Sequence, residues 1–216
     1  MPLQSRVSPF ADLFAGNSRG TLMGNRGGRL HDAQRKLGTR RWASKQWICC
    51  KLKFNDRHRN VWGDSYTELF FLDEVTALAA GHRPCFECRR RNAERFALLF
   101  VGAAPNSFRG DERRGVLRAT AAEMDDLLHA ERLAGRAKRL HRCAIDTLPD
   151  GAMIARDGAA FALKGESLLR WTPQGYAERQ RRPAGAEVDL LTPPSIVAVL
   201  GRGYTPLWHA SAKALT

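Results

Sequence analysis

The sequence has few cysteines and no long apolar run. Its five cysteines in 216 residues are odd in number and irregular in spacing, which argues against a disulfide framework and favours reduced thiols. No segment approaches the roughly 18 to 20 apolar residues of a membrane span, and the first twenty residues lack the pattern of a signal peptide. With 44% hydrophobic residues, the chain can still bury a core without covalent staples. We therefore expect a cytoplasmic globular protein with no membrane partner.

The signatures of several common enzyme classes are also missing. The chain contains no GxSxG and no HExxH, and its Gly-rich segment at residues 24–28 has neither the Lys-Ser/Thr of a Walker loop nor GxGxxG spacing. That segment predicts a tight turn. Glu68 and Asp73 could serve in acid–base chemistry, but helix caps and solvated faces explain carboxylates in such positions equally well. The sequence leaves open whether the protein is an enzyme.

Acidic residues are scarce as well, and this makes the protein strongly basic. The 35 Lys and Arg residues outnumber 22 Asp and Glu, which gives a net charge of +13, and residues 1–60 hold thirteen of the cations against three acids. A local excess of this kind attracts polyanions, and arginine suits bidentate phosphate contacts, although a GC-rich genome is another source of arginine. The predicted nucleic-acid-binding residues are Arg26, Arg29, Arg35, Lys36, Arg40, Arg41, Arg89, Arg90 and Arg91.

Hydrophobic periodicity predicts an α+β fold. Residues 1–20 have no clear period and form a loosely ordered lead-in. Alternating apolar residues over 46–72 predict a β-hairpin, followed by a short helix that Asp73 caps and Gly81 ends. Helical spacing continues over residues 86–101, and Thr120 and Glu123 form a capping box that begins a long central helix over residues 121–143.

The pattern of the sequence changes after Pro149. Short segments separated by turn residues predict a small antiparallel sheet, and residues 192–201 predict one more helix, with Thr192 as its cap and Pro193 at its first position. The predicted organisation is a lead-in at 1–20, a zinc-binding basic α+β domain at 21–145, and a small β-rich domain or extension at 146–216.

The most specific motif is "GHRPCFECRR", in which Cys85 and Cys88 form a CxxC pair at the start of a predicted helix. Two thiolates at this spacing can bind one tetrahedral zinc ion, and the helix N-terminus with its arginines favours their deprotonation. Such a pair supplies half of a zinc site. The other cysteine cluster, Cys49 and Cys50, lies on the predicted strand upstream. The sequence therefore predicts zinc as cofactor, with Cys49, Cys50, Cys85 and Cys88 as its ligands.

Adjacent cysteines on a regular strand point to opposite faces, so both bind one ion only where the backbone kinks. Alternatively, Cys50 packs as a small apolar residue, and His31, His58 or His82 supplies the fourth ligand. A thiol-redox role is another interpretation of the CxxC pair, but the buried strand expected before a thioredoxin-type motif is missing. Cys143 is predicted to be a buried free thiol.

The run "ALAAGHRPCFEC", residues 77–88, resembles the zinc-binding N-terminal domain of the bacterial Ada DNA-repair proteins over about residues 47–91. By this resemblance Cys85 and Cys88 match the second ligand pair of that family, and Cys49 or Cys50 occupies the region of the first. The family's domain binds the DNA backbone through its zinc site, and its most exposed cysteine accepts a methyl group from a phosphotriester. In the family the first two cysteines are separated by three residues, whereas here they are adjacent.

Three hypotheses for the function follow. The first is a zinc-stabilised nucleic-acid-binding protein, with DNA favoured over RNA. The second is a structural or protein-interaction module in which zinc is a staple and a protein is the partner. The third is a thiolate alkyl acceptor in the manner of Ada.

Overall fold

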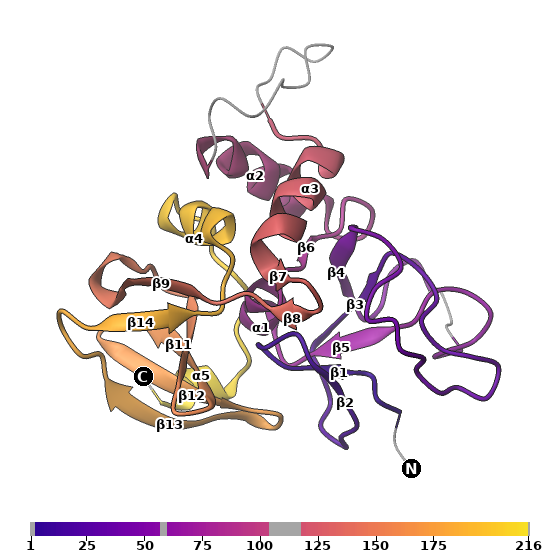
Figure 1. Cartoon of the computed structure of the whole chain (residues 1–216), viewed down its shortest axis with the longest axis horizontal. Helices are drawn as coiled ribbons and strands as arrows, with labels where there is room; N and C mark the ends of the chain where they lie inside the picture. The colour runs from indigo at the N-terminus through magenta and orange to yellow at the C-terminus, as the bar shows by residue number, and fades with distance from the viewer. Residues whose placement is uncertain (1–2, 57–59, 104–117, 216) are drawn as a thin grey trace.

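A computed structural model describes residues 3–56, 60–103 and 118–215. Within this part of the chain the fold is mixed α+β, with two six-stranded sheets, a two-stranded sheet and five α-helices. Figure 1 shows the two large sheets side by side, with α1 between them and helices α2, α3 and α4 gathered at one end. The predicted α+β class is therefore confirmed.

The N-terminal sheet differs from the predicted hairpin. Its strands are β1 Arg6–Val7, β2 Leu13–Phe14, β3 Leu22–Arg26, β4 Trp47–Lys51, β5 Leu69–Phe71 and β6 Arg83–Pro84, in the order β2-β1-β5-β3-β4-β6. The hairpin prediction over 46–72 is wrong, because β3 lies between β4 and β5 and pairs antiparallel with both. The predicted turn at residues 24–28 begins inside β3. Gly24 is required there, since a Cβ would lie 2.0 Å from the Ile48 carbonyl oxygen.

The C-terminal sheet is antiparallel throughout, as predicted. Its strands are β9 His141–Ala144, β10 Met153–Arg156, β11 Ala159–Lys164, β12 Ser167–Thr172, β13 Gly175–Arg181 and β14 Glu187–Leu190, in the order β13-β12-β11-β10-β14-β9. The tight turn between β10 and β11 is made by Asp157 and Gly158, which both have positive φ. The sheet is larger than expected because β9, predicted to be helical, forms its edge.

The helices are α1 Glu74–Ala79, α2 Arg90–Phe100, α3 Ala121–Arg132, α4 Pro194–Gly201 and α5 Ser211–Ala214. The Asp73 cap and the Thr120–Glu123 capping box are confirmed, but Pro193, not Thr192, is the N-cap of α4. The predicted long helix is too long: α3 ends at Arg132, and the chain then forms the hairpin β7 Leu133–Ala134 and β8 Ala137–Lys138. No helix in the described ranges has the length and apolar character needed to cross a membrane.

The main core crosses the predicted domain boundary near residue 145. It packs α2, α3 and α4 against one face of the C-terminal sheet, with Phe96 and Leu128 in the same cluster as Phe161 and Val199. A second cluster packs Val75 of α1 and Ala212 of α5 on the other face. The C-terminal sheet is therefore covered on its two faces by helices from both halves of the chain, whereas strands of the N-terminal sheet form separate clusters of their own.

Candidate metal centre

Strand pairing explains how three cysteines that are far apart in sequence come together. β6 pairs parallel with β4, and the Cys85 backbone N–H donates to the Cys49 carbonyl oxygen at 3.0 Å. This places the turn at residues 85–89 beside the end of β4. The sulfur atoms of Cys50, Cys85 and Cys88 all lie within 4.8 Å of one another, and the three residues are only 6 to 7% exposed. The CxxC pair precedes α2, which begins at Arg90 and not at residue 86 as predicted.

Cys49 does not belong to this group. The pleat of β4 sends Cys49 into the cluster with Leu69 and Phe71, while Cys50 lies on the opposite face with Met23. The Cys49 thiol lies 3.5 Å from the Arg89 guanidinium, and burial raises its pKa despite that charge. The backbone of β4 keeps its regular pairing here, so the kink needed for Cys49 and Cys50 to share one ion is not present.

The three sulfur atoms fit a soft metal ion. In a tetrahedral zinc–thiolate site, Zn–S bonds of about 2.3 Å place the sulfur atoms about 3.8 Å apart, which is compatible with the observed grouping. Backbone N–H groups point at two of them: Lys51 donates to Cys88 Sγ and Glu87 donates to Cys85 Sγ, each at 3.4 Å. Such bonds stabilise thiolates. Hydrogen bonding with Cys50 and Cys88 lowers the pKa of Cys85, whereas bonding to Cys85 raises the pKa of Cys50.

The histidines considered as a fourth ligand lie elsewhere or outside the described residues. The His31 ring stacks on Trp62 and bonds to Thr67 Oγ1 at 2.7 Å and to the Gly63 carbonyl at 2.9 Å. His82 is fully buried beside Trp47, where burial lowers its pKa well below the usual value. His58 lies outside the described residues and stays a prediction from sequence.

No known protein family, curated protein or solved structure matches this chain. The resemblance to the Ada zinc domain therefore stays a prediction, supported by sequence motif alone.

The predicted nucleic-acid-binding residues fall into two groups. Seven are exposed at the surface: Arg29, Arg35, Lys36, Arg40, Arg41, Arg90 and Arg91. For Arg26 and Arg89 the structure does not agree with a surface role, because both side chains are buried, with 1% and 3% of their surface exposed. Arg26 stacks over Trp47 and donates to the carbonyls of Ala11 and Arg41, while Arg89 pairs with Glu74 at 2.6 Å. Arginine counts cannot separate these two environments.

One group of buried polar residues was not anticipated. Glu74 is fully buried and accepts hydrogen bonds from Arg89, from Tyr204 Oη at 2.7 Å and from the Leu207 N–H at 3.0 Å. The neighbouring Asp73 accepts from Tyr176 Oη at 2.9 Å as well as capping α1. Asp73 is thus a structural carboxylate, as its capping signal suggested, while nothing in the sequence marks Glu74 as buried. Cys143, in contrast to its prediction, is only partly buried.

Proposed function

We propose that this protein is a zinc-stabilised nucleic-acid-binding protein that contacts the phosphate backbone, with DNA favoured over RNA. Three thiols are a soft donor set that suits zinc, and their burial suits a structural ion better than a catalytic one. The group joins β4, the turn before α2 and Met23 of β3 in one small cluster. An ion at this point would tie the CxxC turn to the sheet.

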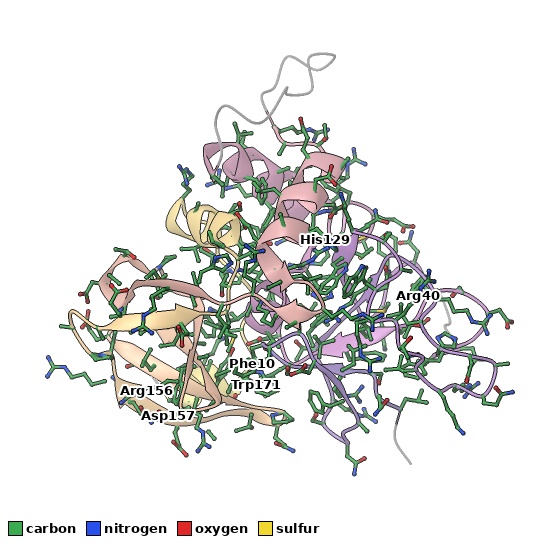
Figure 2. All side chains as sticks on the ribbon, viewed as in Figure 1. Phe10, Arg40, His129, Arg156, Asp157 and Trp171 are labelled. Carbon is green, nitrogen blue, oxygen red and sulfur yellow. The ribbon has the colours of Figure 1, made fainter. Side chains whose placement is uncertain are left out.

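The observation that carries the nucleic-acid proposal is the basic loop, defined here as the exposed residues Arg29, Arg35, Lys36, Arg40 and Arg41 between β3 and β4. Asp32 is the one acid between residues 29 and 46, and its carboxylate accepts from the backbone N–H groups of Gln34 and Lys36. Figure 2 shows Arg40 at the side of the molecule away from the C-terminal sheet. Exposed cations release condensed counterions from phosphates when they bind.

Removing three charges from the basic loop tests this proposal. We expect the variant with Arg35→Gln, Lys36→Gln and Arg40→Gln to bind a fluorescent 20-base-pair duplex roughly 10- to 100-fold more weakly near 0.1 M salt, because each lost phosphate contact removes counterion release. The slope of log K against log salt should become shallower by about 0.9 for each lost contact. Fluorescence anisotropy over a salt series measures both quantities, and an RNA duplex of the same sequence tests the preference for DNA.

The matched control removes the same charge from the C-terminal sheet, with Arg156→Gln, Arg179→Gln and Arg181→Gln, all three exposed. These changes should alter the affinity by less than about threefold, since net charge alone acts weakly at this ionic strength. An equal loss in both variants would mean that no defined surface is used. If the wild-type protein fails to bind either duplex at low salt, the protein-interaction module becomes the better explanation.

A further inference from the structure

A second site is visible where the β1–β2 turn, β3, β4 and the β7–β8 hairpin meet. These segments enclose an open pocket of about 430 Å³, within the size range of small-molecule sites. Four cations line it, namely Arg26, Arg41, Arg136 and Lys138, against the single carboxylate of Asp12. The pocket shares no residue with the Cys50, Cys85 and Cys88 group.

Buried charge is gathered at the wall of the pocket, where Arg26 and Trp47 line it, and next to the wall, where Arg132 stacks on Trp47 without lining the pocket. The Arg26 and Arg132 guanidinium groups lie 3.9 and 4.0 Å from the ring centre of the buried Trp47. Both guanidinium groups donate hydrogen bonds to backbone carbonyl oxygens. These carbonyls have no net charge, so they do not neutralise the positive charge of the two arginines. In the described part of the chain no ion pair joins Arg26, Arg132 or Lys138 to a carboxylate, and the nearby Asp125 is already paired with Arg83.

Two further observations indicate that a negatively charged partner belongs here. Trp47 Nε1 and Arg132 Nε are buried side-chain donors with no hydrogen-bond partner among the described residues. Burial, followed by repulsion from Arg132 and Arg26, lowers the pKa of Lys138 to about 7. Cations are seldom buried together without a counter-ion, because each loses its hydration and repels the others. An oxyanion in the pocket would lie beside Arg26 and Lys138, which line it, and would offset their mutual repulsion.

We propose that this pocket binds a phosphate monoester of about mononucleotide size. Guanidinium groups match phosphate oxygens bidentately, and several cations favour a dianion over a carboxylate or a backbone phosphodiester. The volume exceeds that of bare phosphate and leaves room for an attached base, and the half-buried Trp42 lines the same pocket. This inference goes beyond the proposed function, because the pocket shares only Arg41 with the basic loop and its other cations, Arg26, Arg136 and Lys138, lie on β3 and the β7–β8 hairpin.

Calorimetric titration of the full-length zinc-loaded protein with adenosine 5′-monophosphate, inorganic phosphate and adenosine tests the site. The monophosphate should bind at one site per chain, and adenosine should not. Lys138→Met and Arg136→Ala should each weaken binding by about tenfold or more, as expected for a lost charge-assisted hydrogen bond. Arg156→Ala, which removes the same charge on β10, should change the dissociation constant by less than about twofold. Absence of saturable binding, or equal losses in all three variants, would overturn the proposal.

Thermal unfolding without ligand separates this role from a structural one. Lys138 Nζ donates to the Ala79 carbonyl at 2.5 Å, so a purely structural lysine predicts a lower melting temperature for Lys138→Met. If Lys138 instead binds the ligand and is held among like charges, the melting temperature of Lys138→Met should be unchanged or higher, and phosphate binding should be lost. A lower melting temperature with unchanged binding would contradict the proposal.

Competition against the monophosphate identifies the source of the ester. If a strand end is the natural ligand, a 5′-phosphorylated oligonucleotide should displace the monophosphate and its 5′-hydroxyl counterpart should not. If a free ester is the ligand, neither strand should displace it. Equal displacement by both strands would contradict a monoester site and assign binding to backbone contacts, as proposed for the basic loop.

Discussion

Replacing Cys85 with alanine is expected to abolish metal binding and to destabilise the protein severely. The sulfur of Cys85 lies in one group with those of Cys50 and Cys88, and that group joins the end of β4 to the turn before α2. Binding of a structural zinc ion is worth about 10 to 16 kcal/mol in small zinc domains, comparable to the whole stability of a typical domain. We expect zinc content to fall from one ion per chain to nearly none and the melting temperature to fall by about 10 °C or more. Elemental analysis and circular dichroism measure the two effects.

Cys49→Ala is the matched control for this prediction. It removes a buried thiol one residue from Cys50, but one that lies on the other face of β4 beside Arg89. We expect this variant to keep one zinc per chain and to lose only about 1 to 2 kcal/mol of unfolding free energy, the cost of a small cavity. Equal zinc loss in both variants would mean that Cys49 is a ligand after all. A folded wild-type protein purified without chelators and free of zinc would refute the metal centre itself.

The sequence predicted local features of the site well. Alternation over residues 47–51 placed Cys49 and Cys50 on opposite faces, and the structure bears this out. The α1 cap at Asp73 and the capping box of α3 were also readable, because caps depend on a few neighbouring residues. The spacing of Cys85 and Cys88 identified the two cysteines that the fold brings to Cys50.

Features that depend on contacts between distant parts of the chain could not be predicted from the sequence. The insertion of β3 between β4 and β5 joins segments about 45 residues apart, and no periodicity encodes such a pairing. The apolar spacing that predicted a helix to residue 143 continues past Arg132, where the chain turns into a hairpin at Gly135. The burial of Arg26 and Glu74 depends on partners supplied by the fold, whereas composition places such residues on the surface by default.

Substitution of Glu74 by glutamine is expected to cost about 3 to 5 kcal/mol of unfolding free energy. This carboxylate is fully buried and accepts from Arg89 at 2.6 Å, from Tyr204 and from the Leu207 N–H, so it joins α1 to α2 and to the segment before α5. Glutamine keeps the shape but removes the charge, which leaves Arg89 buried without a counter-ion. Urea unfolding of the zinc-loaded protein, followed by tryptophan fluorescence, measures the change in free energy.

Glu178→Gln is the matched control, because it removes one carboxylate from an ion pair of nearly equal length in solvent. Glu178 pairs with Arg170 at 2.7 Å, but the two side chains are about half exposed. Its loss should cost less than about 1 kcal/mol, the usual value of a surface pair. A Glu74→Gln cost no larger than this would show that the buried network does not join the two halves. The Glu74 side chain accepts its hydrogen bonds from Arg89, Tyr204 and the Leu207 N–H and not from a cysteine sulfur, so folded Glu74→Gln protein should retain its zinc.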